Sequence, residues 1–393
     1  MISVGQAISI VQNNTSATQR PELKKVDEAH RYILYKDVVS PINMPPFRQS
    51  AMDGYALNLH DEETYTVVGE IKAGDGHKTM LKKGEAIRIF TGAPVPDTAN
   101  AVVMQERTHI ENKVLHITSQ VMAGENIRPL GEQVLKSQVA LKKGTSLTPA
   151  ALAFLKSLGI IEVSVFKKPT VAVVVTGNEL IEVGQSLAYG QVYESNTTML
   201  ITALNGLGFQ SVSAYKIDDD YLKTVSVLDQ IISDHDMVIV SGGISVGDYD
   251  FVGKALREIH VEQLFYQVNQ KPGKPLYFGK KGKKIIFALP GNPAAALSCF
   301  YVYIYPALQN MSGASNTSLQ RTTAVSMSNY NIKGDRSQFL KAKYINGKVE
   351  ILDGQNSSML HTFALANALV YVNGISEAIK VNDAVEVILL PIH

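Results

Sequence analysis

The stretch PTVAVVVTGN, residues 169–178, decides the fold of the second half of the chain. It contains five consecutive apolar residues, 171–175, bounded by a proline and a glycine, which predicts a strand covered on both faces. Similar runs recur at 237–240 and 285–289, and segments with helical apolar spacing, such as 222–232, lie between them. This alternation is typical of a mostly parallel sheet with helices on both faces.

The rest of the chain divides around this α/β domain, for which we expect the bounds 169–311. A chain of 393 residues exceeds what one hydrophobic core supports, so several domains are expected. Residues 312–393 are β-rich and predict a small C-terminal β domain. Short β-like runs between glycines and prolines predict an inserted β domain at 41–134, framed by a helical and extended linker domain at 1–40 and 135–168.

Local signals place several element ends. Ser3 and Gln6 form a possible capping box, and Thr148 with Pro149 predicts the start of a second helix. Leu222 is expected on the packed side of the helix within 222–232. The pair Asn346-Gly347 predicts a hairpin in the C-terminal domain.

Composition narrows the class of protein. Lysine plus arginine number 37 against 36 acidic residues, so no strong field would attract nucleic acid or an anionic membrane. The single cysteine, Cys299, excludes an internal disulfide and a cysteine-rich zinc site, and it is expected to be a buried, inert thiol on a core helix. The apolar stretch 294–308 is short for a membrane span, and no secretory signal is evident. We therefore expect a cytoplasmic protein.

Ligands of parallel sheets bind beyond the carboxyl ends of the strands, where four loops are promising. In the loop after 171–175, Glu179 could be a metal ligand or a general base, but a helix-leading turn with a solvated glutamate is the favoured explanation of this loop taken alone. The next loop offers Gly242, Gly243 and Ser245 as a cradle for an anion, and Asp250 could reach a cation bound to that anion.

The other two loops carry paired cations and a helix start. Lys271 and Lys274 are held close together by prolines and suit a tetrahedral dianion or a phosphate, unless they only mark a solvated turn. Pro290, Gly291 and Asn292 lead from a strand into a helix, which is an anion site by geometry or simply a tight structural turn.

A further cluster lies in the predicted inserted domain. Arg48, Ser50 and Asp53 occur together beside apolar residues, where burial without partners would be costly. Thr91 offers one hydroxyl in a loop that follows a strand. Neither segment identifies a substrate, so the residues by themselves predict an enzyme that acts on an anionic or phosphorylated ligand.

Six motifs, in this order and spacing, resemble those of the molybdopterin molybdenumtransferases, a family that includes the carboxy-terminal part of gephyrin. They are PFRQSAMDGYA at 46–56, TGAPVP at 91–96, GENIR at 124–128, SGGISVGD at 241–248, KPGKP at 271–275 and LPGNP at 289–293. The resemblance implies molybdenum insertion into adenylylated molybdopterin, with molybdate as the second substrate, release of AMP, and magnesium or a similar cation assisting.

The resemblance also assigns residues. It implies catalytic roles for Asp53, Asp250, Lys271 and Lys274; ligand binding by Thr91, Arg128, Glu179, Gly242, Gly243, Ser245, Pro290, Gly291 and Asn292; and metal binding by Glu179, Asp218 and Asp250, with Asp219 an alternative to Asp218. It further implies an elongated homodimer in which the sheet domain of one subunit faces the inserted domain of the other. The molybdopterin adenylyltransferase and molybdoenzyme maturation proteins would be neighbouring partners.

Three residues depart from the family pattern. Gln133 stands where the family usually has an aspartate, Ala295 replaces a serine, and Glu194 stands where an aspartate is common. Two other functions are alternatives: a molybdopterin adenylyltransferase, which would lack the flanking modules, and a gephyrin-like scaffold or carrier without catalysis, which would need an additional partner-binding region.

Overall fold

The computed structural model describes all residues except 77, 219, 245–250, 375–377 and 392–393, and they form two compact units. The first unit comprises Met1–Glu22, Arg31–Tyr35 and Val165–His393, and the second comprises Leu23–His30 and Lys36–Ser164. The chain passes between the units four times, and the first and last of these points lie in the short strands β1 (Pro21–Lys25) and β12 (Glu162–Phe166). Within the described ranges, no helix is long and apolar enough to cross a membrane.

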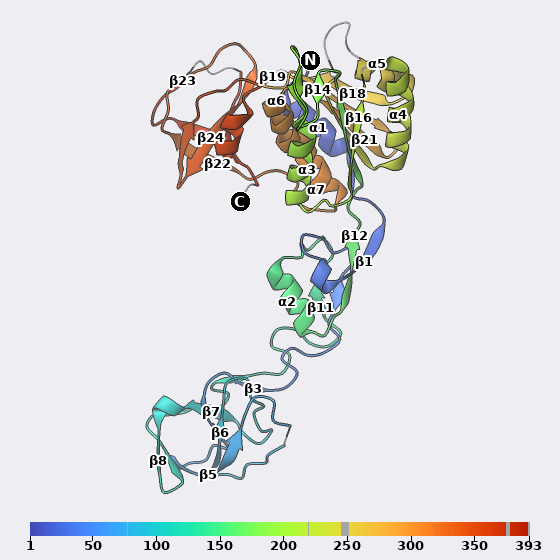
Figure 1. Ribbon diagram of the computed structural model, residues 1–393. Helices are drawn as coiled ribbons and strands as arrows, with labels where there is room; N and C mark the ends of the chain where they lie inside the picture. Colours follow the sequence, from blue (N-terminus) through green and yellow to red (C-terminus); the bar gives the residue numbers. More distant parts are fainter. Residues whose placement is uncertain (77, 219, 245–250, 375–377, 392–393) are drawn as a thin grey trace. The chain divides into compact units, whose positions relative to one another are not determined.

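The first unit is built on a six-stranded sheet with the order β16-β13-β17-β21-β20-β18 (Figure 1). The first four strands are parallel, and β20 and β18 are antiparallel additions at one edge. The strands are β13 (Val171–Thr176), β16 (Val212–Ile217), β17 (Met237–Ser241), β18 (Glu262–Gln267), β20 (Pro275–Lys281) and β21 (Lys284–Leu289). Every residue of β13 and β17 is buried, which confirms the prediction of strands covered on both faces.

Helices cover the two faces because alternate strand residues point to opposite sides. Val171 and Val173 pack in one cluster with residues of α1, α3, α6 and α7, whereas Ala172 and Val174 pack with α4 and α5. The helices are α1 (Val4–Asn14), α3 (Asn196–Gly206), α4 (Tyr221–Asp234), α5 (Phe251–Glu258), α6 (Pro293–Cys299) and α7 (Tyr305–Met311). The prediction for Leu222 is wrong: it is 77% exposed, since it lies across α4 from buried Thr224 and Leu228.

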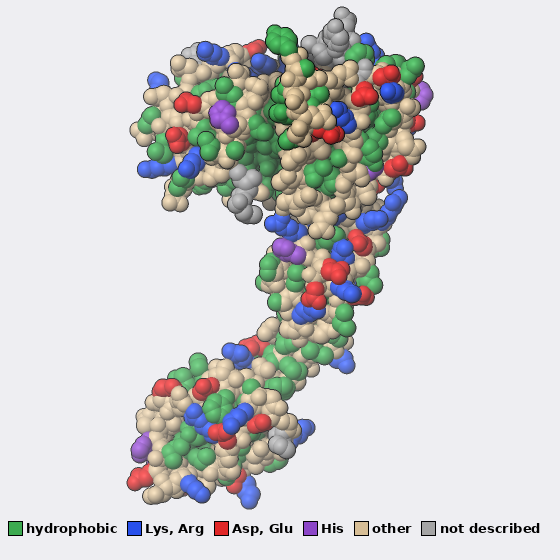
Figure 2. All heavy atoms as spheres, in the orientation of Figure 1, with side chains coloured by type: hydrophobic (Ala, Val, Ile, Leu, Met, Phe, Trp, Pro, Cys, Tyr) green, Lys and Arg blue, Asp and Glu red, His purple; other side chains and the backbone are tan. Residues whose placement is uncertain are grey.

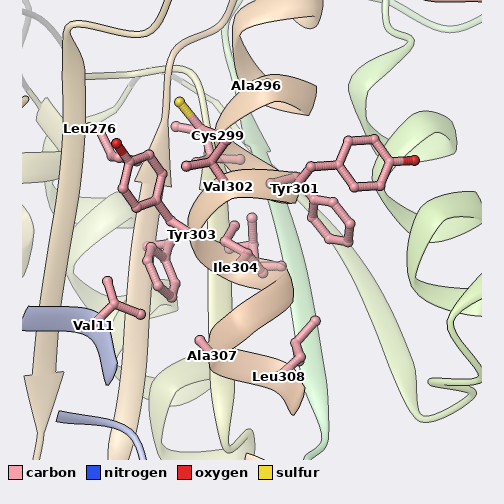
Figure 3. Packing of buried hydrophobic residues seen from close by; sticks show 14 of the residues in the cluster. Val11, Leu276, Ala296, Cys299, Tyr301, Val302, Tyr303, Ile304, Ala307 and Leu308 are labelled. Atoms are coloured by element: carbon pink, nitrogen blue, oxygen red, sulfur yellow. The ribbon is translucent and has the colours of Figure 1, made fainter. Parts of the chain in front are cut away.

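The core helix expected at 294–308 is interrupted by a π-helical segment, Phe300–Ile304 (Figure 3). Pro306 follows in the first turn of α7 and has no N–H to donate to the carbonyl of Val302, which gives a physical reason for a wider turn here. Cys299 is fully buried beside this segment, and burial raises the pKa of its thiol to about 12, as expected for an inert cysteine.

The C-terminal part of the first unit is a small barrel. Its strands are β22 (Arg321–Ser326), β24 (Ser337–Ile345), β25 (Lys348–Ile351), β26 (Ala368–Val372) and β28 (Ala384–Leu389), accompanied by β23 (Tyr330–Asn331), β27 (Ala378–Ile379) and α8 (Leu360–Leu365). Because β24 pairs with both β25 and β26, the ring of strands closes. Asn346 and Gly347 both have positive φ in the turn from β24 to β25, which confirms the predicted hairpin.

The second unit contains a six-stranded sheet with the order β7-β4-β6-β5-β9-β8. Its strands are β4 (Gly54–Leu57), β5 (Thr64–Ile71), β6 (Glu85–Ile89), β7 (Ala101–Met104), β8 (Thr108–Glu111) and β9 (Val114–Ile117). The smaller elements are η1 (Val26–Glu28), β2 (Val38–Val39), β3 (Gln49–Ser50), η2 (Gln105–Arg107), β10 (Ile127–Arg128), β11 (Val139–Leu141) and α2 (Pro149–Ser157). Both capping predictions are confirmed: Ser3 and Gln6 form the capping box of α1, and Thr148 caps α2 with Pro149 in its first turn.

Candidate active site

A cavity of about 700 Å³ lies where β13, β17 and β21 end. The register aligns these ends, since Val175 pairs with Ser241 and Ser241 pairs with Leu289. The short strands β14 (Leu180–Ile181) and β15 (Val192–Tyr193) contribute to its wall. Six of the predicted site residues line the cavity: Glu179, Gly242, Gly243, Pro290, Gly291 and Asn292.

Two buried polar atoms of the cavity wall lack a hydrogen-bond partner within the described part of the chain: Thr176 Oγ1 and Asn196 Oδ1. The amide nitrogen of Asn196 donates to Ser241 Oγ at 2.9 Å and to the Gly291 carbonyl at 2.8 Å, so the side chain is fixed. Such orphan atoms are costly unless a ligand pairs with them. Sequence reasoning did not assign either residue a role, although Asn196 follows one of the three departures, Glu194.

Two glycines allow the backbone to pass close to this wall. Gly242 has a φ of +94°, and a Cβ there would lie 2.6 Å from the Thr176 carbonyl oxygen. Gly243 has a φ of +64°, and its Cβ would lie 2.6 Å from Thr176 Oγ1. A side chain at either position would be strained and would fill the space beside the unpaired hydroxyl. The glycines therefore preserve an open cradle.

The loop with Lys271 and Lys274 is held in place by the side chain of Gln270, which is 1% exposed. Gln270 Nε2 donates to the Gly273 carbonyl at 3.0 Å, and the Tyr303 hydroxyl donates to Gln270 Oε1. Figure 3 shows Tyr303 on the π-helical segment. Strand β19 (Gln270–Lys271) also pairs with β24 of the barrel. Both lysines are half-buried, and neither belongs to the wall of the 700 Å³ cavity, which ends nearby at Pro275.

The start of α6 differs from the predicted open anion site. The N–H groups of Ala294 and Ala295 both donate to the Ser357 carbonyl, at 3.1 and 3.2 Å, and Asn292 Nδ2 donates to Ser357 Oγ at 3.0 Å. A loop of the barrel thus already occupies the donors that the Pro290-Gly291-Asn292 turn was expected to offer. Ser357 also brings a hydroxyl to this turn, close to the position where Ala295 lacks one.

The barrel loop that carries Ser357 is held by a buried lysine. Lys341 is 3% exposed, and its ammonium donates to the carbonyls of Gly354, Asn356 and Met359 at 2.8, 3.1 and 3.0 Å. Burial lowers the pKa of Lys341 to about 8. The three acceptors surround one cation, so the loop is fixed over the start of α6.

The predicted metal ligands are only partly placed. Glu179 lines the cavity, while Asp218 follows the end of β16, the strand beside β13, and forms an ion pair with Lys223 at 3.7 Å. Ser245, Asp250 and the alternative Asp219 lie outside the described residues. In the portion of the chain that is described, no three His, Cys, Asp or Glu residues form a group able to hold a metal ion.

Asp53, Thr91 and Arg128 belong to the second unit. Asp53 Oδ1 accepts hydrogen bonds from Thr91 N at 2.8 Å and Thr91 Oγ1 at 2.7 Å, and these bonds lower the pKa of the Asp53 carboxyl. Arg128 is exposed on β10, where it pairs with Gln49 of β3. Asp53 and Thr91 therefore form one preorganised pair.

The cluster around Asp53 has a structural explanation for its other two polar residues. Arg48 donates to the carbonyls of Pro96, Asp97 and Ala99, the last at 2.7 Å. Ser50 Oγ donates to the Met52 carbonyl at 2.6 Å.

Two departures from the family pattern also have local partners. Glu194 Oε1 accepts from Thr197 N at 2.9 Å at the start of α3, and the backbone N–H of Gln133 donates to Met44 O.

Comparisons with known proteins agree along the chain. Residues 2–159 match the family model of the MoeA N-terminal region (domain I and II), 172–310 match a probable molybdopterin binding domain, and 323–390 match the MoeA C-terminal region (domain IV). Molybdopterin molybdenumtransferase of Staphylococcus epidermidis is 33% identical, with 99% of this chain and 95% of that protein covered. The Haemophilus influenzae protein of the same name is 34% identical, with 94% of each covered. The crystal structure of molybdopterin biosynthesis moeA protein from Pyrococcus horikoshii OT3 has a TM-score of 0.84 and 28% identity, and covers 99% of this chain and 100% of that one.

Proposed function

Because this chain belongs to the molybdopterin molybdenumtransferase family, we propose residue roles for its reaction, molybdenum insertion in molybdenum cofactor biosynthesis. The chain is an enzyme of this family, and the predicted multidomain α/β fold is confirmed. The similarity spans nearly the whole chain, including both flanking modules, so the adenylyltransferase and scaffold alternatives are not favoured.

We propose that the 700 Å³ cavity binds adenylylated molybdopterin. The observation that carries this assignment is the pair of unpaired buried oxygens, Thr176 Oγ1 and Asn196 Oδ1, beside the cradle of Gly242 and Gly243. Asn196 Oδ1 can only accept a hydrogen bond, so it suits an N–H or O–H group of the substrate. The cradle lets a phosphate approach backbone N–H groups.

Molybdate is the proposed second substrate, held by Lys271 and Lys274. Two ammonium groups on one braced loop suit a tetrahedral dianion better than a single flexible cation does. Because Ser357 occupies the first N–H groups of α6, we assign the anion to the lysines and not to the start of that helix. Ser357 Oγ, held at Asn292, is the available hydroxyl near the turn where Ala295 lacks one.

A divalent cation, Mg²⁺ in our proposal, fits the carboxylates that are described. Mg²⁺ in proteins is often held by one or two carboxylates together with substrate phosphates, so a group of three acidic residues is not required. Glu179 and Asp218 would hold it, with Asp250 as the third predicted ligand. The cation would neutralise charge on the pyrophosphate as the bond to AMP breaks.

We also propose that the enzyme is a homodimer and that Asp53 acts on the substrate held by the partner subunit. In this scheme, Asp53 orients a water molecule whose oxygen bonds to the AMP phosphorus as the phosphoanhydride bond breaks. Thr91 keeps the Asp53 carboxyl ionised through its two hydrogen bonds. A cytoplasmic location, and docking to the adenylyltransferase or to maturation proteins, remain predictions from the sequence.

The central experiment follows AMP release and reconstitution of a molybdenum-free oxidoreductase. It uses adenylylated molybdopterin, Mg²⁺ and molybdate with wild type, Asn196→Ala and Asn205→Ala. Asn205 is an exposed asparagine on the same helix α3 and serves as the matched control. We expect Asn196→Ala to weaken substrate binding at least about tenfold, which corresponds to one buried hydrogen bond of roughly 1.4 kcal/mol. Equal binding by both variants would contradict the assignment.

The dimer proposal has its own test. Asp53→Ala and Asn196→Ala subunits would be mixed, dissociated and reassociated. Half of the resulting dimers would be mixed, and each would carry one intact site, so roughly a quarter of the wild-type activity should return. With substrate well below the wild-type Kd, Asn196→Ala dimers keep about a tenth of the wild-type activity or less. If Asp53 served its own subunit, the mixture would show only the mean of the two parent activities. Molecular mass in solution provides the accompanying check.

A further inference from the structure

A second cavity, of about 520 Å³, lies at the amino-terminal ends of β13, β17 and β21, opposite to the strand ends at which the proposed active site lies. Three segments of the first unit form it: residues 13–20, which begin in the last turn of α1, Lys167 and Lys168 before β13, and the hairpin 280–285, in which β20 ends and β21 begins. Asp236, directly before β17, completes its floor. Strands of this length span roughly 20 Å, so this cavity is separate from the proposed active site.

The cavity wall is strongly basic. It contains six basic side chains, those of Arg20, Lys167, Lys168, Lys280, Lys283 and Lys284, and one carboxylate, Asp236. The whole chain has a net charge of only +1, and Figure 2 shows acidic and basic side chains interspersed over the visible face. An excess of basic side chains in the wall makes the local electrostatic potential more positive, which attracts anions.

The single carboxylate is already engaged. Asp236 Oδ2 accepts hydrogen bonds from Thr170 N at 3.0 Å and Thr170 Oγ1 at 3.1 Å, and Oδ1 lies 3.8 Å from Lys284 Nζ. Asp236 therefore neutralises at most the nearest lysine. Arg20, Lys167 and Lys283 are exposed, and their side chains make no ion pair or hydrogen bond among the residues that the structure describes.

The cavity is preformed. Lys168 is 9% exposed, donates to the Gly208 carbonyl at 2.8 Å, and lies 4.5 Å from the ring centre of Tyr32. Burying an ammonium group is costly, so a buried lysine in the wall indicates a built feature. Lys280 Nζ donates to Asn14 Oδ1 at 2.9 Å, which ties the hairpin to the end of α1, and it also lies 3.6 Å from Glu262 Oε2. Cations that converge from three fixed segments lose little freedom on binding.

We propose that this cavity binds an oligophosphate anion, in which two or more phosphate groups are linked. Guanidinium and ammonium groups with hydroxyl and amide donors, here including Ser16 and Gln19, match phosphate oxygens. None of the described residues that line the cavity is aromatic, so the phosphate chain, and not a base, is the recognised part. This inference is independent of the proposed function at the other end of the strands.

The test is calorimetric titration of the full-length protein with sodium triphosphate. The variants are Lys167→Ala combined with Lys283→Ala, and Lys281→Ala as the matched control. Lys281 lies on the same hairpin but pairs with Asp229 at 2.6 Å and does not line the cavity. We expect one triphosphate per chain, at least about tenfold weaker binding in the double variant, and a change below about twofold in the control.

Each further outcome supports or overturns the inference. No measurable binding, or equal weakening in the double variant and the control, would overturn it, as would weakening only by Lys271→Ala, which would place the anion in the active site. ATP that binds as tightly as triphosphate would support recognition of the phosphates alone. ATP, or a glutamate-rich peptide, that binds more than about tenfold tighter than triphosphate would overturn the assigned ligand class.

Discussion

The brace under the lysine loop gives a quantitative prediction for Gln270→Leu. The substitution leaves two groups without partners: the buried Tyr303 hydroxyl and the Gly273 carbonyl. A buried unsatisfied polar group costs about 1–3 kcal/mol, and leucine recovers part of this by apolar burial, so we expect a loss of about 3 kcal/mol. In a unit of this size, that loss lowers the melting temperature by roughly 6–12 °C.

The same substitution should change catalysis in a specific way. Gln270 does not touch the proposed substrates, but it fixes the loop that presents Lys271 and Lys274. We expect the KM for molybdate to rise at least about fivefold, with a smaller change in kcat. Without the brace, the lysine loop must become ordered when molybdate binds, and the free energy of this ordering weakens binding. Scanning calorimetry measures the stability effect, and AMP release at varied molybdate measures the KM.

Tyr303→Phe separates the two effects. It removes the hydroxyl but keeps the hydrogen bond from Gln270 to the Gly273 carbonyl, so it should cost about 1–2 kcal/mol and leave the molybdate KM within about twofold. If Gln270→Leu lost stability but kept the wild-type KM, the loop would not depend on the brace for function. If it lost less than about 0.5 kcal/mol, the energetic reasoning would be refuted.

Four further results are expected. Lys341→Met should destabilise the protein by about 2–4 kcal/mol, because three carbonyls lose their donor, whereas Lys343→Met, exposed on the same strand, should be nearly neutral in thermal unfolding. Since the pKa of Lys341 is lowered to about 8, the unfolded chain binds more protons above that pH, and the stability of wild type relative to Lys341→Met should rise towards pH 10.5 and not fall. Cys299, with its pKa raised to about 12, should not react with a disulfide reagent at pH 8 until the protein is unfolded; labelling of the folded protein would contradict its burial. Thr91→Val should raise the lowered pKa of Asp53, as followed by carboxyl NMR, because the hydroxyl donor is lost. The stabilisation of the folded protein by the remaining hydrogen bond to the ionised Asp53 carboxyl is present at neutral pH and disappears as pH falls through that pKa. An unchanged pKa would show that the hydroxyl contributes nothing.

Features with short-range causes could be predicted from the sequence. The apolar run at 171–175 is a strand that is buried throughout, and Ser3 and Thr148 cap their helices as their neighbours indicate. The cavity-lining loops were also found, since polar and glycine residues directly follow buried strands. Leu222 shows the limit of such reasoning: its spacing from Val225 suggests one apolar face, but packing covers the side of α4 that carries Thr224 and Leu228, and Leu222 lies across the helix from them.

Features that depend on distant parts of the chain could not be predicted. Ser357 reaches the start of α6 from a loop more than 60 residues later. Its carbonyl accepts hydrogen bonds from the first N–H groups of that helix, which the local sequence had suggested were free to bind an anion. Asn196 has an orphan oxygen only because its amide nitrogen is held by Ser241 and Gly291, residues from two other loops. No spacing rule in a single sequence contains such pairings.

The contact of Ser357 with α6 limits how the C-terminal barrel could be exchanged among relatives during evolution. A recombinant chain would inherit a foreign loop against a native helix start, and a mismatch there would leave the Ala294 and Ala295 N–H groups unpaired beside the cavity. The crossover could preserve every residue of the sheet domain and still damage its site. Barrel and sheet domain should therefore be inherited as a matched pair, despite being separate modules in the chain.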